Sequence, residues 1–345
     1  MTLRDLVLVP LAALSAALPA SAQDVREGAP VAASHRAMYT RGVEFLIDHQ
    51  QPNGSFDGDM GVTGICVMAL LASGEDPNHG PYAKAVRSGV RALISKQNSR
   101  TGQIGSGMYQ HGFGLLCLAE CYGAVDGRML AEEHPRLART LGEAVELGVR
   151  CAVTAQEQNP FSAWRYGPRS RDADTSVTGA VLMGLLGARN AGIAVPDEAI
   201  DGALQYMSSM TSSEGDVGYS GVGSFGSSEA RTAIAATVFA VAKQREAPAF
   251  LSTKARVLQE AGGPERSGGW SHPCYRRYYV SQALFQTDHA AWRNWSTDNT
   301  RDLVQRQKDD GSLALEGSFR GGCYPTGMLL LSAALDFTFL PIYER

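Results

Sequence analysis

The segment RDADTSVTG, residues 171–179, places two carboxylates, Asp172 and Asp174, directly before an apolar run. A carboxylic acid can donate a proton near neutral pH when burial raises its pKa. Asp followed by Thr and Ser at the start of an apolar helix is also typical of an N-cap, which stabilises a helix by about 1 kcal/mol. The pattern therefore leaves three roles open for Asp174: a structural cap, a buried general acid, or another binding role.

Aromatic and basic side chains gather in the corresponding loops along the chain. The candidates for substrate binding are Tyr109, His111, Trp164, Tyr166, Arg231, Trp270, Tyr278 and Tyr324. Aromatic faces attract cations, and arginine binds carboxylates and phosphates. Each ring can instead pack between loops, and a lone histidine in an apolar helix is more often hydrogen-bonded in the core. We expect a small hydrophobic or anionic ligand here, and a protein partner remains an alternative.

The cysteines do not form a metal-binding pattern. The chain contains six, without a CxxC pair: Cys66, Cys117, Cys121, Cys151, Cys274 and Cys323. Cys66 and Cys117 fall in apolar helical runs, where a free thiol behaves as a small hydrophobe. We therefore expect mostly buried free thiols, no metal and no cofactor, while disulfides remain open for an exported chain.

A loop followed by an apolar helix recurs six times. The first copy, QQPNGSFDGDMGVTGICVMALLA, begins at Gln50, and later copies begin at Gln97, Gln156, Met210, Ala261 and Gln305, roughly 45 to 60 residues apart. The helix before each loop is amphipathic, as in PYAKAVRSGVRALISKQ, which suits an outer layer wet on one side. The helix after it is apolar nearly all round, as in TGAVLMGLLGA, and must be buried.

The two ends of this array favour a closed ring. The last inner helix, residues 324–337, is as apolar as the first, residues 61–73, whereas an open solenoid needs polar caps. We predict an all-α fold, an α/α toroid or α6/α6 barrel of six inner and six outer helices, with residues 23–345 as one domain. All inner helices then begin at one mouth, where their dipoles favour an anion. We also expect each loop, with its glutamine and aromatic residue, to join the outer ring to the inner ring.

The first 22 residues are typical of a signal peptide. Arg4 precedes an apolar run, residues 6–18, and Ala20-Ser21-Ala22 predicts cleavage near Ala22–Gln23 and export to the periplasm or the medium. A membrane anchor is the alternative and requires a longer apolar stretch. No transmembrane span is expected in the mature chain. The net charge of −4 argues against a nucleic-acid binder.

The loops resemble the prenyltransferase and squalene-cyclase (terpenoid cyclase) repeat superfamily, whose motif is Q-x-x-x-G-x-aromatic. Gln50, Gly54 and Phe56 stand at its spacing, with Phe in place of Trp, and Gln307 and Gly311 keep it in the last repeat. The resemblance covers essentially the whole mature chain and implies an α6/α6 barrel.

The resemblance also suggests an activity. Class II terpenoid cyclases carry an Asp-x-Asp-Asp motif whose middle Asp protonates an alkene or epoxide. Asp174 falls on that acid position, Asp172 on its helper, and Thr175 replaces the final Asp, as in oxidosqualene-type cyclases. Those cyclases are about twice this length and close their cavity with a second domain, which argues against cyclisation of a long polyprene. The zinc ligands of protein prenyltransferases and the thioester motif of complement-like proteins have no counterpart here.

Three functions remain open from the sequence. The first is a terpenoid-cyclase-like enzyme with Asp174 as the acid. The second is a non-catalytic toroid that binds a protein, lipid or glycan at its loop mouth, and the third is a polysaccharide-active toroid enzyme. A deep aromatic pocket that reaches Asp174 would favour the first function, a shallow dish the second, and an open groove of Arg, Tyr and His the third.

Overall fold

A computed structural model describes residues 31–223, 226, 228–261, 272–318, 322–337 and 340–343. The part of the chain from residue 31 onward forms one compact unit. Its regular elements in the described ranges are all helical, with isolated β-bridges in the loops. The predicted signal peptide, residues 1–22, lies outside the described residues.

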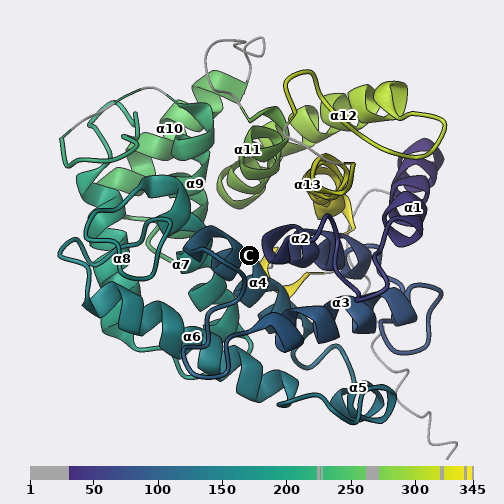
Figure 1. Ribbon diagram of the computed structural model, residues 1–345. Helices are drawn as coiled ribbons and strands as arrows, with labels where there is room; N and C mark the ends of the chain where they lie inside the picture. Colours follow the sequence, from purple (N-terminus) through teal and green to yellow (C-terminus); the bar gives the residue numbers. More distant parts are fainter. Residues whose placement is uncertain are drawn as a thin grey trace, which may run out of the picture. The chain divides into compact units, whose positions relative to one another are not determined.

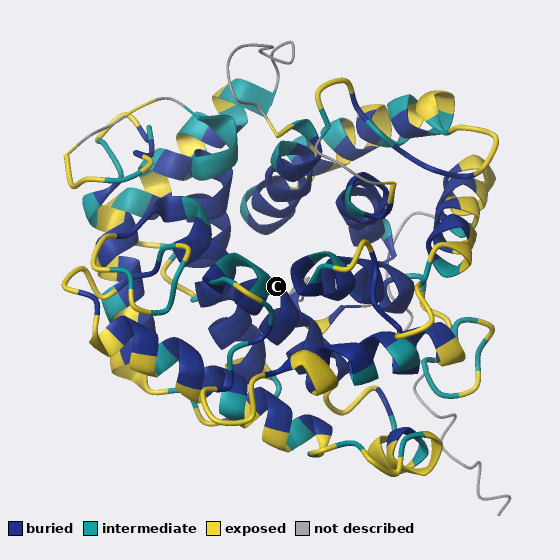
Figure 2. Ribbon diagram, viewed as in Figure 1, coloured by how far each residue is buried: buried dark blue, intermediate teal, exposed yellow. Residues whose placement is uncertain are grey.

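Six helices form an inner ring (Figure 1): α2 (Met60–Leu71), α4 (Met108–Cys121), α7 (Thr175–Asn190), α9 (Glu229–Val241), α11 (Pro273–Thr287) and α13 (Cys323–Ala333). Each contacts the next, and α13 contacts α2, so the ring closes. They are buried on nearly all sides (Figure 2). Glycine permits the close approach of α4 and α7, because a Cβ at Gly112 would lie 2.6 Å from the carbonyl carbon of Ala180.

Six helices surround this ring: α1 (Ala33–Asp48), α3 (Ala83–Lys96), α6 (Leu141–Glu157), α8 (Asp197–Ser209), α10 (Pro248–Ala261) and α12 (His289–Arg306). They are amphipathic, as the sequence predicts: in α3, Val86, Val90 and Leu93 are buried while Lys84 and Lys96 are exposed. The predicted α/α toroid of six inner and six outer helices is therefore confirmed. One further helix, α5 (Gly127–Glu133), was not predicted.

A recurring glutamine joins successive outer helices. The side-chain Nε2 of Gln97 donates to the carbonyl oxygen of Gly102 in its own loop, at 3.0 Å, and to that of Ala144 in α6, at 2.8 Å. Gln50 and Gln156 make the same pair of bonds in their repeats. Each turn is therefore fixed to the next outer helix by one side chain.

The last of these glutamines closes the outer ring. Gln307 Nε2 donates to the carbonyl oxygens of Gly311, at 2.9 Å, and of Met38 in α1, at 2.8 Å. The glutamines thus link outer helix to outer helix, whereas the sequence led us to expect each loop to be a bridge between the two rings. An amide with two N–H donors reaches its own loop and a neighbouring helix terminus at once, and that neighbour is an outer helix.

The bridge to the inner ring is made by a different side chain, four residues after the helix N-cap. Threonine hydroxyls at this position accept hydrogen bonds at 3.0 to 3.1 Å from the backbone N–H of the buried loop residue, namely Thr63 from Phe56, Thr178 from Trp164 and Thr326 from Leu313. The buried aromatic or aliphatic residue is thereby held against the first turn of the inner helix.

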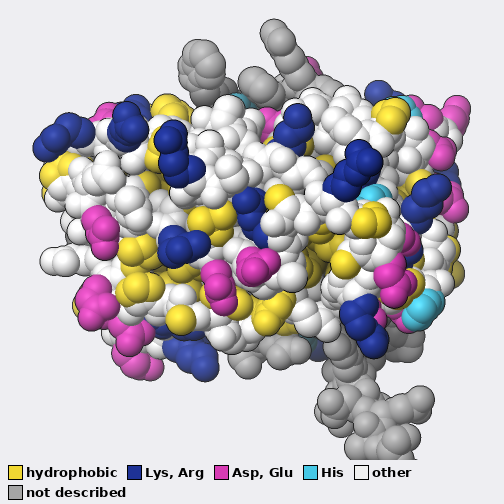
Figure 3. Space-filling model, turned by 60° about the horizontal axis from the view of Figure 1, so that its bottom comes forward, with side chains coloured by type: hydrophobic (Ala, Val, Ile, Leu, Met, Phe, Trp, Pro, Cys, Tyr) yellow, Lys and Arg dark blue, Asp and Glu magenta, His cyan; other side chains and the backbone are white. Residues whose placement is uncertain are grey.

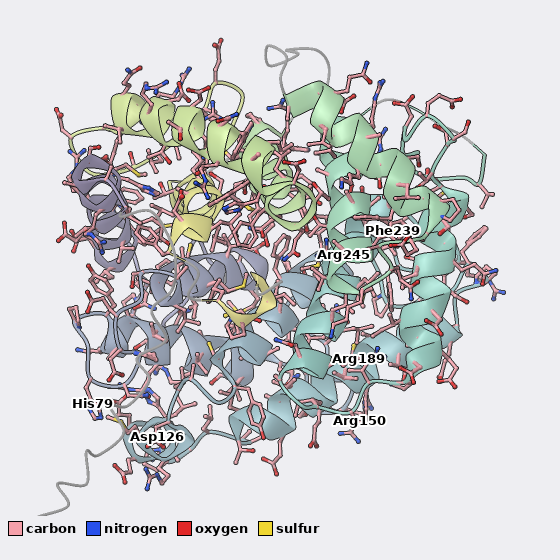
Figure 4. All side chains as sticks on the ribbon, turned by 180° about the vertical axis from the view of Figure 1, so that it is seen from behind. His79, Asp126, Arg150, Arg189, Phe239 and Arg245 are labelled. Carbon is pink, nitrogen blue, oxygen red and sulfur yellow. The ribbon has the colours of Figure 1, made fainter. Side chains whose placement is uncertain are left out.

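The barrel is covered at the C-terminal ends of its inner helices (Figure 4). After the short helix η1 (Ala334–Asp336), the helix η2 (Pro341–Tyr343) contacts α7, and the Ile342 amide donates to Glu120 Oε2 in α4 at 3.3 Å. Arg245, labelled in that view, donates to the carbonyl oxygen of Gln286 at 2.6 Å. Among the described residues, the loops at the opposite end, where the inner helices begin, form the mouth.

Candidate functional site

Asp174 is the N-cap of α7, and its two carboxylate oxygens have different surroundings. Oδ1 accepts a hydrogen bond from the Val177 amide at 2.8 Å, as the capping interpretation predicts. Oδ2 is buried without a hydrogen-bond partner in the described structure, and Arg165 Nε lies 3.9 Å from it. The residue is 0% exposed. Burial raises the pKa of Asp174 to about 6, against the opposing effects of the cap bond and Arg165.

Asp59, the N-cap of α2, provides an internal comparison. Its Oδ1 accepts from the amides of Gly61, at 2.7 Å, and Val62, at 3.1 Å, and its Oδ2 accepts from Gln110 Nε2. Asp59 is half-buried, so both of its oxygens are satisfied at the edge of the solvent. Capping an inner helix therefore does not require a buried oxygen without a hydrogen bond. Oδ2 of Asp174 is such an oxygen, and it distinguishes Asp174 from Asp59.

Arg165 connects the two carboxylates of the DxD segment. Its Nη1 forms an ion pair with Oδ2 of Asp172, whose side chain is 59% exposed. The same guanidinium approaches the buried Asp174 through Nε. One carboxylate is thus solvated and ion-paired, while its neighbour is dry and has a raised pKa. Such contrasting environments are typical of groups that divide acid and base roles between them.

Two tyrosines from successive loops cover Arg165. The hydroxyl groups of Tyr166 and Tyr219 are 2.5 Å apart, and the Arg165 Cζ lies 5.5 Å and 5.7 Å from their ring centroids. The Arg231 Cζ lies 5.9 Å from the Tyr219 ring. Tyr166 is 56% exposed and Tyr219 is 38% exposed, so they form an aromatic surface open to a ligand.

Aromatic rings fill the barrel below the mouth. The ring centroids of Phe113 in α4 and Tyr278 in α11 are 6.3 Å apart, and those of Tyr278 and Tyr279 are 4.7 Å apart. These residues are 1% to 2% exposed, so they do not line a water-filled cavity. Tyr109 and Tyr324, on the first turns of α4 and α13, are half-buried. Among the described residues, the rings of α4 and α11 therefore pack together inside the barrel below the mouth.

The structure brings together part of the predicted site. Asp172, Asp174 and Tyr166 lie in one loop cluster with Arg231 beside them. Predicted Trp270 lies outside the described residues. Arg165 and Tyr219 belong to the basic and aromatic residues of the loops but were not among the predicted site residues. Arg165 carries the weak signal of a basic residue close before the DxD segment, but Tyr219 belongs to the next repeat, and no local pattern relates it to Asp174.

Three predicted binding residues lie in the core rather than at the mouth. His111 is 0% exposed, because its Nδ1 accepts from the Ile104 amide and its Nε2 donates to the Gly148 carbonyl oxygen, each at 3.1 Å. It thus occupies the position that threonine holds in other repeats, and burial lowers its pKa to about 4. Trp164 and Tyr278 are 2% and 1% exposed, and the Trp164 indole donates to a backbone carbonyl in α6.

Other features of the described residues bear on ligands and partners. No group of three or more His, Cys, Asp or Glu side chains there could hold a metal ion. The six cysteines are free and buried, as the sequence suggests. No described helix is both long and apolar enough to cross a membrane. On the face shown in Figure 3, acidic and basic side chains are interspersed rather than separated into patches.

Comparisons with known proteins show similarity at the level of the fold. No protein-family model matches the sequence, and no curated protein matches it. The structure is similar to an inactive variant of the α-1,6-mannanase GH76A of Salegentibacter sp. HEL1_6 in complex with α-1,6-mannotetrose. The TM-score is 0.64 at 9% identity, and the match covers 88% of this chain and 99% of the mannanase.

It is also similar to a variant of the type II terpene cyclase MstE from Scytonema in complex with geranylgeranyl dihydroxybenzoate. That TM-score is 0.58 at 14% identity, covering 89% of this chain and 98% of the cyclase. A family 76 glycoside hydrolase from a bovine Bacteroides thetaiotaomicron strain gives a TM-score of 0.61 at 10% identity, covering 88% of this chain and 77% of the hydrolase. At these identities the likeness establishes the α/α toroid fold alone.

Proposed function

We propose that this protein is an enzyme that uses Asp174 as a general acid at the mouth of its barrel, in a reaction like that of the terpenoid cyclases. The observation that supports this most directly is the second oxygen of Asp174, which is buried, has no hydrogen-bond partner in the described structure and belongs to a carboxyl group with a pKa of about 6. A purely structural cap does not need such an oxygen, as Asp59 shows. A protonated carboxyl in this position can donate to a substrate that displaces the covering residues.

The proposed step is a proton transfer. The Oδ2–H bond of Asp174 breaks while the π bond of an alkene opens and a C–H bond forms on one of its carbons. With an epoxide, an O–H bond forms on the oxygen and one C–O bond breaks. Either step leaves a carbocation and a carboxylate. Arg165, 3.9 Å away, stabilises that carboxylate. The faces of Tyr109, Tyr166 and Tyr219 are available to stabilise the cation. Transfer of a proton from a carbon next to the cation to water or to the Asp174 carboxylate forms a C=C bond and gives a neutral product.

The shape of the barrel limits the substrate. Since Phe113, Tyr278 and Tyr279 are buried inside the barrel, the reacting end is expected at the mouth rather than beside these rings. The length of this chain, which is about half that of the oxidosqualene-type cyclases, does not argue against this proposal. The type II terpene cyclase is matched over 98% of its chain, so it is comparable in size to this protein.

The test is turnover of a panel of polyprenes, polyprenyl epoxides and glycans by purified protein, with product analysis by mass spectrometry. We expect wild type to convert a polyprene or epoxide and Asp174→Asn to lose at least about a hundredfold in rate, since general acid catalysis contributes about 10² to 10⁴. Asp59→Asn is the matched control, because it changes an equivalent cap, and should retain activity. Equal loss in both variants, or full activity in Asp174→Asn, would reject the assignment.

A second candidate, a polysaccharide-active enzyme, is favoured by one specific observation. Two carboxylates in contrasting environments contact one guanidinium beside exposed tyrosines, which is a pattern that glycoside hydrolysis uses. The same panel separates the two functions. Release of reducing ends from a glycan, lost in both Asp172→Asn and Asp174→Asn, would support the glycosidase. If no compound turns over, a non-catalytic toroid that binds a protein, lipid or glycan is the remaining alternative.

Export forms part of the proposal and rests on residues 1–22. Expression of the full chain in a bacterial host, followed by fractionation and N-terminal sequencing, tests it. We expect a product outside the cytoplasm that begins at Gln23. A cytoplasmic product with an intact N-terminus would contradict this part of the proposal without affecting the role of Asp174.

A further inference from the structure

The carboxylates next to the site already have cationic partners. Three ion pairs lie in the loops and first turns around the mouth: Asp172 with Arg165, Asp216 with Arg256, and Glu229 with Arg276. Arg231, in the first turn of α9, differs from these arginines. In the part of the chain that the structure describes, no carboxylate lies within 4.0 Å of its guanidinium. The site therefore contains a cation whose charge is not neutralised by a direct partner.

Backbone carbonyls hold this guanidinium in place. Arg231 Nε donates to the Val217 carbonyl oxygen at 2.8 Å, and Nη2 donates to that of Gly226 at 2.9 Å. Nη1 makes no hydrogen bond to the described residues. The side chain is half-buried, and burial lowers its pKa while Tyr219 and Asp174 oppose that change. A cation that is partly desolvated and fixed by neutral acceptors retains most of its attraction for an anion.

The position of Arg231 relates it to the acid. Its Cζ lies 5.9 Å from the Tyr219 ring, and Arg165 lies 5.7 Å from the same ring. Arg165 is the residue that approaches Oδ2 of Asp174. An anion on Arg231 would thus be close to the acid without forming an ion pair with the guanidinium that serves Asp172. It would also favour the protonated form of Asp174, because a neighbouring negative charge disfavours a carboxylate.

We infer that Arg231 binds an anionic group of the substrate, a carboxylate or a phosphate, beside Tyr219. The substrate is then an amphipathic organic anion whose neutral end reaches Asp174. Guanidinium groups bind both carboxylate and phosphate through charge-assisted hydrogen bonds. This inference rests on the proposed function for the identity of the site, but anion binding can be measured without any turnover.

A structural role is the alternative, in which Arg231 only fixes the loop through Val217 and Gly226. Arg256 is a suitable control, because it holds the same loop through Asp216, at 3.1 Å, from the outer helix α10. Arg231→Gln removes the charge, and Arg231→Lys keeps it with fewer donors. If structure alone matters, these variants and Arg256→Gln will lower the melting temperature and leave anion binding unchanged.

The experiment uses the full chain with inorganic diphosphate and benzoate as probes, by calorimetry and thermal shift at low ionic strength. We expect saturable binding of at least one probe to wild type, weakened tenfold or more by Arg231→Gln and less by Arg231→Lys. Arg256→Gln should keep it. No saturable binding of either probe to wild type, or unchanged binding in Arg231→Gln, overturns the inference. If Arg231→Gln does not fold, unchanged binding in Arg231→Lys together with retained probe binding at high salt overturns it.

The two proposals fail in different ways. Loss of anion binding in Arg231→Gln with full turnover in Asp174→Asn would reject the acid and keep the anion site. Loss of turnover in Asp174→Asn with unchanged anion binding in Arg231→Gln would keep the acid and reject the anion site. A substrate test completes the comparison, because a polyprenyl carboxylate or phosphate should be a better substrate than its neutral alcohol.

Discussion

At the scale of single residues, Asp174 carries two roles on the two oxygens of one carboxylate. Oδ1 caps α7, and Oδ2 is left dry and unpaired. The sequence presented these roles as alternatives, because an N-cap pattern contains no information about the second oxygen. Arg165 approaches that oxygen, and Tyr166 and Tyr219, from two different loops, lie next to Arg165.

The raised pKa of Asp174 has a consequence for stability. Because the folded pKa of about 6 exceeds the ordinary value of 3.8, the native state holds this proton more tightly than the unfolded state. Its stabilising effect is complete below about pH 3.8 and is lost as the pH rises through about 6. A difference of roughly two pKa units corresponds to about 2 to 3 kcal/mol.

We therefore expect wild type to gain about 2 to 3 kcal/mol relative to Asp174→Asn between pH 7 and pH 4. Urea unfolding of both proteins at the two pH values measures this difference. Asp59→Asn serves as the control for removing the charge of a capping carboxylate from an inner helix. A constant difference between wild type and Asp174→Asn would mean that the carboxyl titrates as it does in water.

His111 shows the opposite case, in which chemistry suggested by residue type is not realised. Both of its ring nitrogens are bonded to backbone groups of α6 and its own loop. We expect His111→Ala to destabilise the fold by about 2 to 4 kcal/mol, through two lost hydrogen bonds and a cavity. Turnover and anion binding, measured where the variant is folded, should not change. Loss of turnover in a fully folded variant would mean that His111 takes part in the reaction.

At the scale of elements, the turns of the repeats are defined by two side chains. In four repeats a glutamine bonds the turn to the next outer helix, and a threonine or His111 bonds it to the inner helix. The glutamine bonds join segments that are far apart along the chain, so sequence spacing could indicate the repeat but not the partner. The sequence indicated the repeats and the loops that join the two rings, but not the glutamine bond to the next outer helix.

Removing one glutamine side chain leaves two carbonyl oxygens without a donor. We expect Gln97→Ala to cost about 2 to 3 kcal/mol in unfolding free energy, because Gln97 is 4% exposed and the freed groups stay buried. Gln307→Ala should cost a similar amount, since it removes the bond between the last loop and the first outer helix. Chemical denaturation measures both. Exposed Gln259 in α10 is the control, and Gln259→Ala should change stability by less than about 0.5 kcal/mol.

At the scale of the whole compact unit, closure of the inner ring by α13 on α2 makes every repeat a neighbour of two others. A closed ring has no terminal repeat from which to unfold, unlike an open array. The buried thiols report on this coupling, because Cys66, Cys117 and Cys323 lie in three different inner helices. We expect all thiols to be unreactive in the native state and to become reactive in one transition that coincides with loss of helicity.

Thermal unfolding followed by circular dichroism and by a thiol reagent tests this expectation. Thiols that react in separate steps would indicate that parts of the ring open independently. The comparison of Gln97→Ala with Gln307→Ala adds a second criterion, because both should shift the same single transition. A second transition in Gln307→Ala would show that closure of the outer ring is local in its effect.

The sequence by itself determined the class of fold. Helical periodicity, small residues in the inner helices and the sixfold loop pattern are local properties, and they sufficed to predict an α/α toroid with a common mouth. It also pointed to Asp174 as the residue to examine. These features could be read from the chain because backbone geometry and burial of apolar faces are encoded in short windows.

Only the tertiary structure decided which side chains meet at the mouth. Tyr219 and Arg231 come from the next repeat to the loop that holds both Arg165 and Asp174. The rings of α4 and α11 meet inside the barrel. The electrostatics of a carboxyl group depend on dehydration and on charges within a few ångströms, whatever their separation along the chain. For that reason Asp174 could be predicted as the acid from the sequence, whereas the residues that surround it are known only from the tertiary structure.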